Sequence, residues 1–181
     1  MTDVRAFGQL AARELSEGKS QTEAVRSTPP SEIRAAPAYS HILIATDGSA
    51  LAEKAITTGL ALAKGLRAKA TVVTVSGAWA SARTCHGSVA VPFDAYEKAA
   101  GETASQILAS VSALAKRLNA ECVTLHVKGN TAEGILECAK VGGCDLIVMA
   151  SHGRRGLSRL ILGSQATRVL TSSSVPVLIC K

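Results

Sequence analysis

The sequence has few aromatic residues and no long apolar run. Aromatic side chains make up 3% of the 181 residues, and a surface that stacks single-stranded nucleic acid needs several of them together. No apolar run approaches the roughly 20 residues of a membrane span. The first residues also lack the apolar core of a signal peptide. We therefore expect a cytoplasmic protein that binds neither membranes nor nucleic acid.

Paired cysteines and clustered histidines are also missing. The five cysteines are an odd number and contain no C-x-x-C pair; they are Cys85, Cys122, Cys138, Cys144 and Cys180. This pattern is typical of reduced thiols in a reducing compartment. The four histidines are too dispersed for metal-ligand spacing, so no protein metal site is expected.

The common nucleotide and hydrolase motifs do not occur. The sequence contains no G-x-x-x-x-G-K-[ST], no G-x-G-x-x-G after a first strand and no G-x-S-x-G, which argues against a Walker-type ATPase, a Rossmann dehydrogenase and an α/β-hydrolase. Residues 151–181 contain no Asp or Glu, so His152 is the only candidate general base there. We predict no catalytic residue and at most slow hydrolysis of a bound nucleotide.

From residue 39 onward, short aliphatic runs alternate with longer segments of helical periodicity. This alternation predicts a doubly wound, Rossmann-like α/β domain with a parallel sheet. The expected strands cover residues 41–46, 71–75, 121–127, 145–150 and 175–180, and the expected helices lie between them, with residues 164–172 forming the last. Asp94 should cap the longest helix, whose expected buried stripe is Ala100, Thr103, Ile107, Val111, Leu114 and Leu118.

Residues 1–38 have a different character. Their five basic and five acidic residues cancel, and residues 27–37 are rich in Ser, Thr and Pro. A short amphipathic helix with a linker and a disordered tail both fit this segment. We predict an N-terminal extension over residues 1–38 and one domain over residues 39–181.

Pro176 constrains the last expected strand. Proline has no N–H for a central ladder, so this strand should lie at the edge of the sheet or begin at the proline. An apolar edge strand leaves backbone groups without partners and favours pairing with another chain. We therefore expect a homodimer through the strand from Val175 to Cys180.

A glycine-containing loop follows the expected strand 145–150. Gly153 and Gly156 lie in the loop, and Gly163 stands directly before Ser164, where the last helix is expected to begin. Glycines let backbone N–H groups approach an anion, and a helix N-terminus attracts one. Residues 151–181 also carry five basic residues and no acid. A solvated basic face fits these charges as well as an anion site does.

Two other turns should meet this loop. In open parallel sheets ligands bind beyond the carboxyl ends of the strands, where the strand order reverses. The turns after the first and second strands contain Asp47 and Val75. Asp47 can accept hydrogen bonds from an adenine or a ribose, although a helix-capping carboxylate fits its position equally.

Several of these motifs resemble the universal stress protein family. Its nucleotide motif G-x2-G-x9-G-[ST] matches Ala150-x2-Gly153-x9-Gly163-Ser164 except at the first glycine. A strand ending in Thr46-Asp47-Gly48-Ser49, the turn Gly129-Asn130-Thr131-Ala132-Glu133, DLIVMASHGRRG and the closing VPVLIC also match, in the family's order. The resemblance covers about residues 39–181.

The resemblance implies a five-stranded parallel sheet of order 3-2-1-4-5, a dimer paired through the last strands, and bound ATP. Asp47, with Thr46 before it, and the backbone near Val75 match adenosine contacts, and Met149 and Ala150 would lie beside adenine and ribose. The phosphate-binding positions match His152, Gly153, Arg154, Gly163, Ser164 and Gln165. Mg²⁺ or Mn²⁺ would be held through phosphate oxygens and water.

Ala150 departs from the family motif. If this position needs a positive φ or close approach to the ribose, alanine costs about 1 kcal/mol or more. If it is an ordinary strand end, alanine costs nothing.

The leading hypothesis is an ATP-binding protein of stress response or signalling, and the alternative is a family member that acts through its dimer edge and N-terminal extension without ATP. An adenylating enzyme would need an S-G-G-x-[DE]-S loop where the chain has Thr46-Asp47-Gly48-Ser49-Ala50. A receiver domain would need an aspartate where the chain has His126-Val127-Lys128. Both of these classes are disfavoured.

Overall fold

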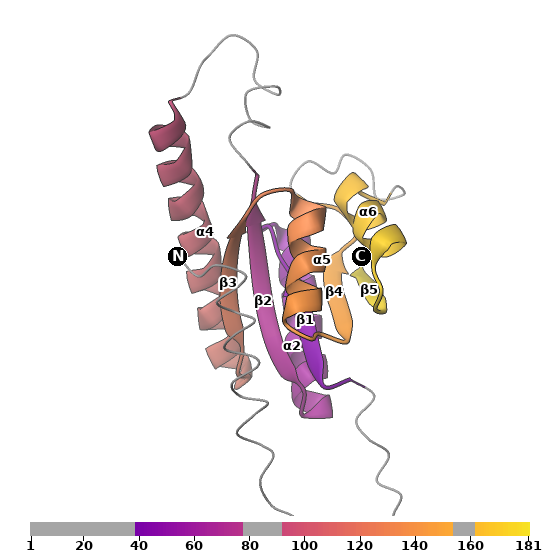
Figure 1. Cartoon of the computed structure of the whole chain (residues 1–181). Coiled ribbons are helices and arrows are strands. Elements are labelled where there is room, and N and C mark those ends of the chain that lie inside the picture. Colours follow the sequence, from indigo (N-terminus) through magenta and orange to yellow (C-terminus); the bar gives the residue numbers. More distant parts are fainter. Residues whose placement is uncertain (1–38, 78–91, 154–161) are drawn as a thin grey trace, which may run out of the picture.

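Five short aliphatic segments form the strands of one parallel sheet. The computed structural model describes residues 39–77, 92–153 and 162–181. The strands are β1 (His41–Ala45), β2 (Lys69–Ser76), β3 (Val123–Lys128), β4 (Leu146–Ala150) and β5 (Val177–Cys180). They pair in parallel in the order β3-β2-β1-β4-β5, so the predicted fold class and strand order are confirmed (Figure 1).

Helices cover both faces of this sheet. The described helices are α2 (Ala50–Leu66), α4 (Phe93–Leu118), α5 (Thr131–Val141) and α6 (Ser164–Ser172). The helices α2 and α4 pack on one face, and α5 and α6 pack on the other (Figure 1). Because both faces are covered, the central strands are apolar along almost their whole length rather than alternating with polar residues.

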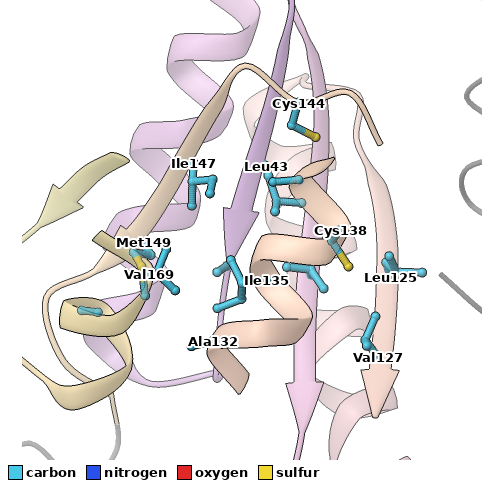
Figure 2. Close-up of a cluster of buried hydrophobic side chains, with 14 residues drawn as sticks. Leu43, Leu125, Val127, Ala132, Ile135, Cys138, Cys144, Ile147, Met149 and Val169 are labelled. Atoms are coloured by element: carbon cyan, nitrogen blue, oxygen red, sulfur yellow. The ribbon is translucent and has the colours of Figure 1, made fainter. Parts of the chain in front are cut away.

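The core on the α5 and α6 face is aliphatic. Figure 2 shows Leu43 and Ile147 of the sheet on the same side as Ile135 of α5, with Met149 beside Val169 of α6. Burial of one such side chain contributes about 1.5–3 kcal/mol. This packing holds α5 and α6 against the strands, so the N-terminal ends of both helices have fixed positions.

The three helices that begin near the carboxyl ends of β1, β3 and β4 start differently. The Ser49 hydroxyl accepts a hydrogen bond from the Ala52 N–H of α2 at 3.2 Å, and the Asn130 side chain caps α5. The residue before α6 is Gly163, which offers no side-chain cap. The first N–H groups of α6 therefore lack the side-chain acceptor that the other two helices have.

The strand β5 lies at the edge of the sheet, as Pro176 predicts. It begins at Val177, two residues later than expected, and the Pro176 carbonyl accepts a hydrogen bond from the Ile147 N–H at 3.0 Å. Leu178 on this strand is 37% exposed. The edge thus presents both unpaired backbone groups and apolar side chains.

The predicted start and buried face of the long helix were wrong in detail. Pro92 rather than Asp94 occupies the N-cap of α4, and Asp94 lies in the first turn, where a carboxylate favours the helix dipole. Thr103, expected in the buried stripe, is exposed, whereas Ala104 next to it is buried. Because the buried Ala104 side chain is small, the helix can approach the sheet closely at this point.

Four cysteines are described and all are free thiols. Burial raises the pKa of Cys138 to about 11 and that of Cys144 to about 12, with the neighbouring acids Glu137 and Asp145 adding to the effect. Both thiols therefore stay protonated and act as small core residues. No helix in residues 39–77, 92–153 or 162–181 is long and apolar enough to cross a membrane.

Asp145 ties the start of β4 to the chain that enters β1. Its Oδ2 accepts hydrogen bonds from the backbone N–H and the hydroxyl of Ser40, at 2.7 and 2.6 Å, and its Oδ1 accepts one from the His41 N–H at 3.0 Å. Burial acts to raise the pKa of Asp145, but the hydrogen bonds from Ser40 and His41 outweigh it, and the pKa lies below its ordinary value. The ionised carboxylate therefore stabilises the fold.

We predict that Asp145→Ala lowers the free energy of unfolding by about 1–2 kcal/mol at pH 7, a figure that allows for partial exposure of the site. Because the folded pKa is lowered, this contribution is complete above the unfolded pKa of about 3.9 and is lost as the pH falls through the folded pKa. Denaturant unfolding from pH 7 to pH 3 should therefore show wild type and variant converging. A difference that stays constant over this range would contradict the role of the charge, and Asp145→Asn, which keeps an acceptor, should lie between the two.

Candidate functional site

A cavity of about 490 Å³ opens at the carboxyl edge of the sheet. Its walls come from the ends of β1, β2 and β4, the loops that follow β1 and β4, and the first residues of α5 and α6. All these segments meet because parallel strands end at one edge. The cavity is within the size range of small-molecule binding sites.

The structure brings together nearly all of the residues that the sequence indicated. Ten of the eleven lie in the wall of the cavity: Thr46, Asp47, Val75, Met149, Ala150, His152, Gly153, Gly163, Ser164 and Gln165. The eleventh, Arg154, lies outside the described residues, as do Gly156 and the segment 78–91.

The cavity has an apolar part and a polar part. Val73, Val75, Ile135 and Met149 supply aliphatic and thioether surface, and all four belong to or pack against the core on the α5 and α6 face. The polar side chains in the wall are Thr46, Asp47, Thr131, His152, Ser164 and Gln165. An apolar wall with a few polar groups suits a flat heteroaromatic ring joined to a polar or charged group.

Asp47 joins two of the loops. Its Oδ1 accepts a hydrogen bond from the Ser49 N–H at 3.0 Å, which fixes the carboxylate in the turn after β1. A Cβ added to Gly153 would run into Oδ2 of the same carboxylate. A larger residue at position 153 would therefore have to displace the Asp47 carboxylate, which is a constraint from the protein itself, before any ligand is considered.

Gly163 is held by the other end of the same loop. Its N–H donates a hydrogen bond to the Ser151 carbonyl at 2.8 Å, and a Cβ there would lie 3.1 Å from the His152 Cα. The Gly163 N–H is thus already used. The donors that α6 can offer to an anion in the cavity are those of its own first turn, beginning at Ser164, which is exposed.

The backbone answers the part of the question about Ala150 that concerns positive φ. Ala150 is the last residue of β4 and pairs with Cys180 of β5. Among the residues whose backbone is described, the only non-glycine residues with positive φ are Arg67 and Asn119. Ala150 is an ordinary strand end, so the methyl group causes no backbone strain.

Gln165 and Arg168 connect α6 with α5. The Gln165 Oε1 accepts a hydrogen bond from the Ala132 N–H at 3.1 Å, so the side chain acts as a second cap for α5. The Arg168 guanidinium pairs with the Glu133 carboxylate at 2.6 Å. Arg168, counted in the sequence as part of a basic cluster, is therefore engaged away from the cavity wall.

The turn after β3 also contributes to the cavity wall, although none of its residues was predicted as a site residue. Thr131, the first residue of α5, lies in the wall beside Ile135. The turn Gly129-Asn130-Thr131 was identified in the sequence, and the rule that strand ends converge would have placed it at this edge. In the described part of the chain, no group of three His, Cys, Asp or Glu side chains could hold a metal ion.

Comparison with known proteins gives the family. The model of the family described as "Universal stress protein family" matches residues 38–181. Universal stress protein YxiE of Bacillus subtilis is 31% identical over 147 residues, which cover 79% of this chain and 99% of that protein.

Solved structures agree with this match. Universal stress protein UspA from Lactobacillus plantarum superposes with a TM-score of 0.67 at 19% identity, covering 79% of this chain and 98% of that one. A universal stress protein solved in complex with cAMP superposes with a TM-score of 0.59 at 25% identity, covering 78% and 97%.

The contact between Gly153 and Asp47 can be tested by a double-mutant cycle. We predict that Gly153→Ala lowers the free energy of unfolding by about 1–3 kcal/mol, because the new methyl group displaces the carboxylate. In an Asp47→Ala background the methyl group has room, so Gly153→Ala should lower the free energy of unfolding much less. Denaturant unfolding of the four proteins gives a coupling energy, expected to exceed about 0.5 kcal/mol. Additive effects would show that the two loops do not press on each other through this contact.

Proposed function

The chain belongs to the universal stress protein family, and we propose that it binds an adenine nucleotide, ATP, in the cavity at the carboxyl edge and acts as a dimer in stress response or signalling. One observation carries the proposal: ten residues matched to the family's nucleotide site, from segments far apart in sequence, line one cavity. The structural neighbour in complex with cAMP supports an adenine ligand.

The division of the cavity suggests how the nucleotide lies. The adenine ring would rest against the apolar wall of Val75 and Met149, and the ribose would lie toward Asp47. The phosphates would then lie at the start of α6, next to Gly163 and Ser164. This end of the cavity combines an uncapped helix N-terminus with a neutral, exposed serine, and both favour an anion.

The residues of the cavity wall also bear on how a divalent ion would be held and how fast the bound nucleotide would be hydrolysed. A divalent ion, Mg²⁺ or Mn²⁺, would be coordinated mainly by phosphate oxygens and water. Asp47 and His152 are the only titratable side chains in the described wall. Asp47 is bound into its turn and lies against Gly153, so His152 is the one candidate base beside the phosphates. We expect slow hydrolysis at most.

The phosphate placement can be tested with Ser164→Asp. A carboxylate in the first turn of α6 interacts favourably with the helix dipole, so the variant should be as stable as wild type or more stable by a few tenths of a kcal/mol. The same charge should repel the phosphates and weaken ATP binding by at least about tenfold. Binding is measured by calorimetry, and retained nucleotide by heat-denaturing the purified protein and assaying the supernatant for adenine.

The matched control is Ser105→Asp on α4, where the same change falls on an exposed serine away from the cavity. It should leave ATP affinity unchanged. If Ser164→Asp binds ATP as wild type does, the phosphates do not lie at α6. If wild type neither retains nor binds an adenine nucleotide, the alternative of a family member without ATP is favoured.

The exposed edge strand β5 supports the proposed dimer, and it also supports the alternative of a family member that acts through its dimer edge without ATP. Val177, Ile179 and Cys180 are half-buried in the single chain, and Leu178 is exposed. A second copy of the strand would pair the free backbone groups and cover these side chains. We propose that β5 is the dimer interface in both versions of the function.

We predict that Leu178→Lys weakens self-association by at least about tenfold, because it places a charge in the interface. Sedimentation equilibrium measures the change. The control is Val123→Lys on β3, the opposite edge strand, where the valine is 46% exposed. Equal effects of the two substitutions, or a monomeric wild type, would reject β5 as the interface.

A further inference from the structure

A serine and a histidine meet on the face of the sheet that carries α4. The Ser76 Oγ lies 2.9 Å from the His126 Nε2. Neither residue was matched to the nucleotide site, and both are half-buried rather than enclosed. We propose that Ser76 is an activated serine that His126 deprotonates, and that it is acylated by reactive esters whose acyl group enters the cavity beneath α4.

The register of the sheet creates this pair. The strands β2 and β3 run parallel, with Thr74 opposite His126 and Ser76 opposite Lys128. Side chains alternate along a strand, so Ser76 and His126 point to the same face. Because both strands are held in the sheet, the hydroxyl and the ring are positioned before any reactant arrives.

His126 is in the protonation state that a base requires. Burial lowers its pKa most, the Lys128 ammonium on the same strand lowers it further, and the Glu97 carboxylate of α4 raises it in part. Lys128 and Glu97 themselves form an ion pair. On α4, Tyr96 lies close by and donates its hydroxyl hydrogen to the Gly77 carbonyl at 2.8 Å. The net effect is a neutral imidazole at pH 7, and in the tautomer with its proton on Nδ1 the Nε2 atom can accept the serine proton.

A second cavity can hold the acyl group of the reacting ester. Its volume is about 360 Å³ and Ser76 lies in its wall. The α4 side of the wall has an apolar part made of Ala99, Ala100, Ala104 and Ile107, and Tyr96 and Thr103 complete that side. The sheet side includes the Asp47 carboxylate beside Val75. A short uncharged acyl chain suits the apolar part of this wall.

The covalent step is an acyl transfer. The Ser76 Oγ attacks the carbonyl carbon of the ester while its proton moves to the His126 Nε2. The tetrahedral intermediate then collapses, and the bond to the leaving alkoxide or phenolate breaks. The proton on Nε2 neutralises that group or passes to water, and Ser76 is left as an ester. No oxidant or metal takes part.

The test uses the full chain and para-nitrophenyl butyrate. Release of para-nitrophenolate gives the rate, and mass spectrometry of the tryptic peptide 70–83 locates the butyryl group. Fragmentation separates Ser76 from Ser81 in that peptide. We expect a stoichiometric adduct on Ser76, with a rate that rises with pH and has a midpoint below 6.5, the ordinary pKa of histidine.

Variants distinguish an activated serine from a merely exposed one. Ser76→Ala should remove the adduct, and His126→Gln should slow its formation about 100-fold, within the range for general base catalysis. Ser105→Ala on α4 is the control and should change neither. Equal rates in His126→Gln and wild type, or an adduct no faster on Ser76 than on Ser105, would overturn the proposal. Both results are independent of whether the chain binds ATP.

Discussion

Parallel pairing places the carboxyl ends of all five strands at one edge of the sheet, and the rest of the molecule depends on this polarity. The chain leaves β1 toward the face of α2 and leaves β4 toward the face of α6. Since β1 and β4 are neighbours, their following loops diverge and leave a cavity between them. The same polarity aims the N-terminal ends of α2, α5 and α6 at that edge. The site is a consequence of strand order before any individual side chain is considered.

The glycines of the loop after β4 have structural partners of their own. Gly153 leaves space for the carboxylate of Asp47, and Gly163 closes the loop with a hydrogen bond to the Ser151 carbonyl. A motif identified as nucleotide-binding is therefore also a packing motif. It fixes the distance between two loops, and a ligand would use the space that results. Such a motif can persist in a chain whether or not it binds a nucleotide, so motif matching and ligand binding are separate questions.

Apolar runs were sufficient for the parallel α/β fold, and Pro176 was sufficient for the edge position of β5. The strand order and most of the ten residues in the cavity wall followed from the resemblance to the family rather than from local signals. The sequence was insufficient where two signals of similar size compete. Asp94 is a good cap by type, but the helix begins two residues earlier, at Phe93 after Pro92, and the carboxylate still interacts with the dipole from the first turn. The buried face of α4 depends on how closely the helix approaches the sheet, which periodicity alone does not determine.

The pair of Ser76 and His126 could not have been found in the sequence for a different reason. The two residues are far apart in the chain, with α4 between them, and neither belongs to a motif. Their contact depends on the register of β2 against β3, and a shift of one residue would turn His126 to the opposite face. Register is set by the packing of all the strands together. A function that depends on strand register, rather than on a contiguous motif, can therefore be recognised only once the structure of the sheet is known.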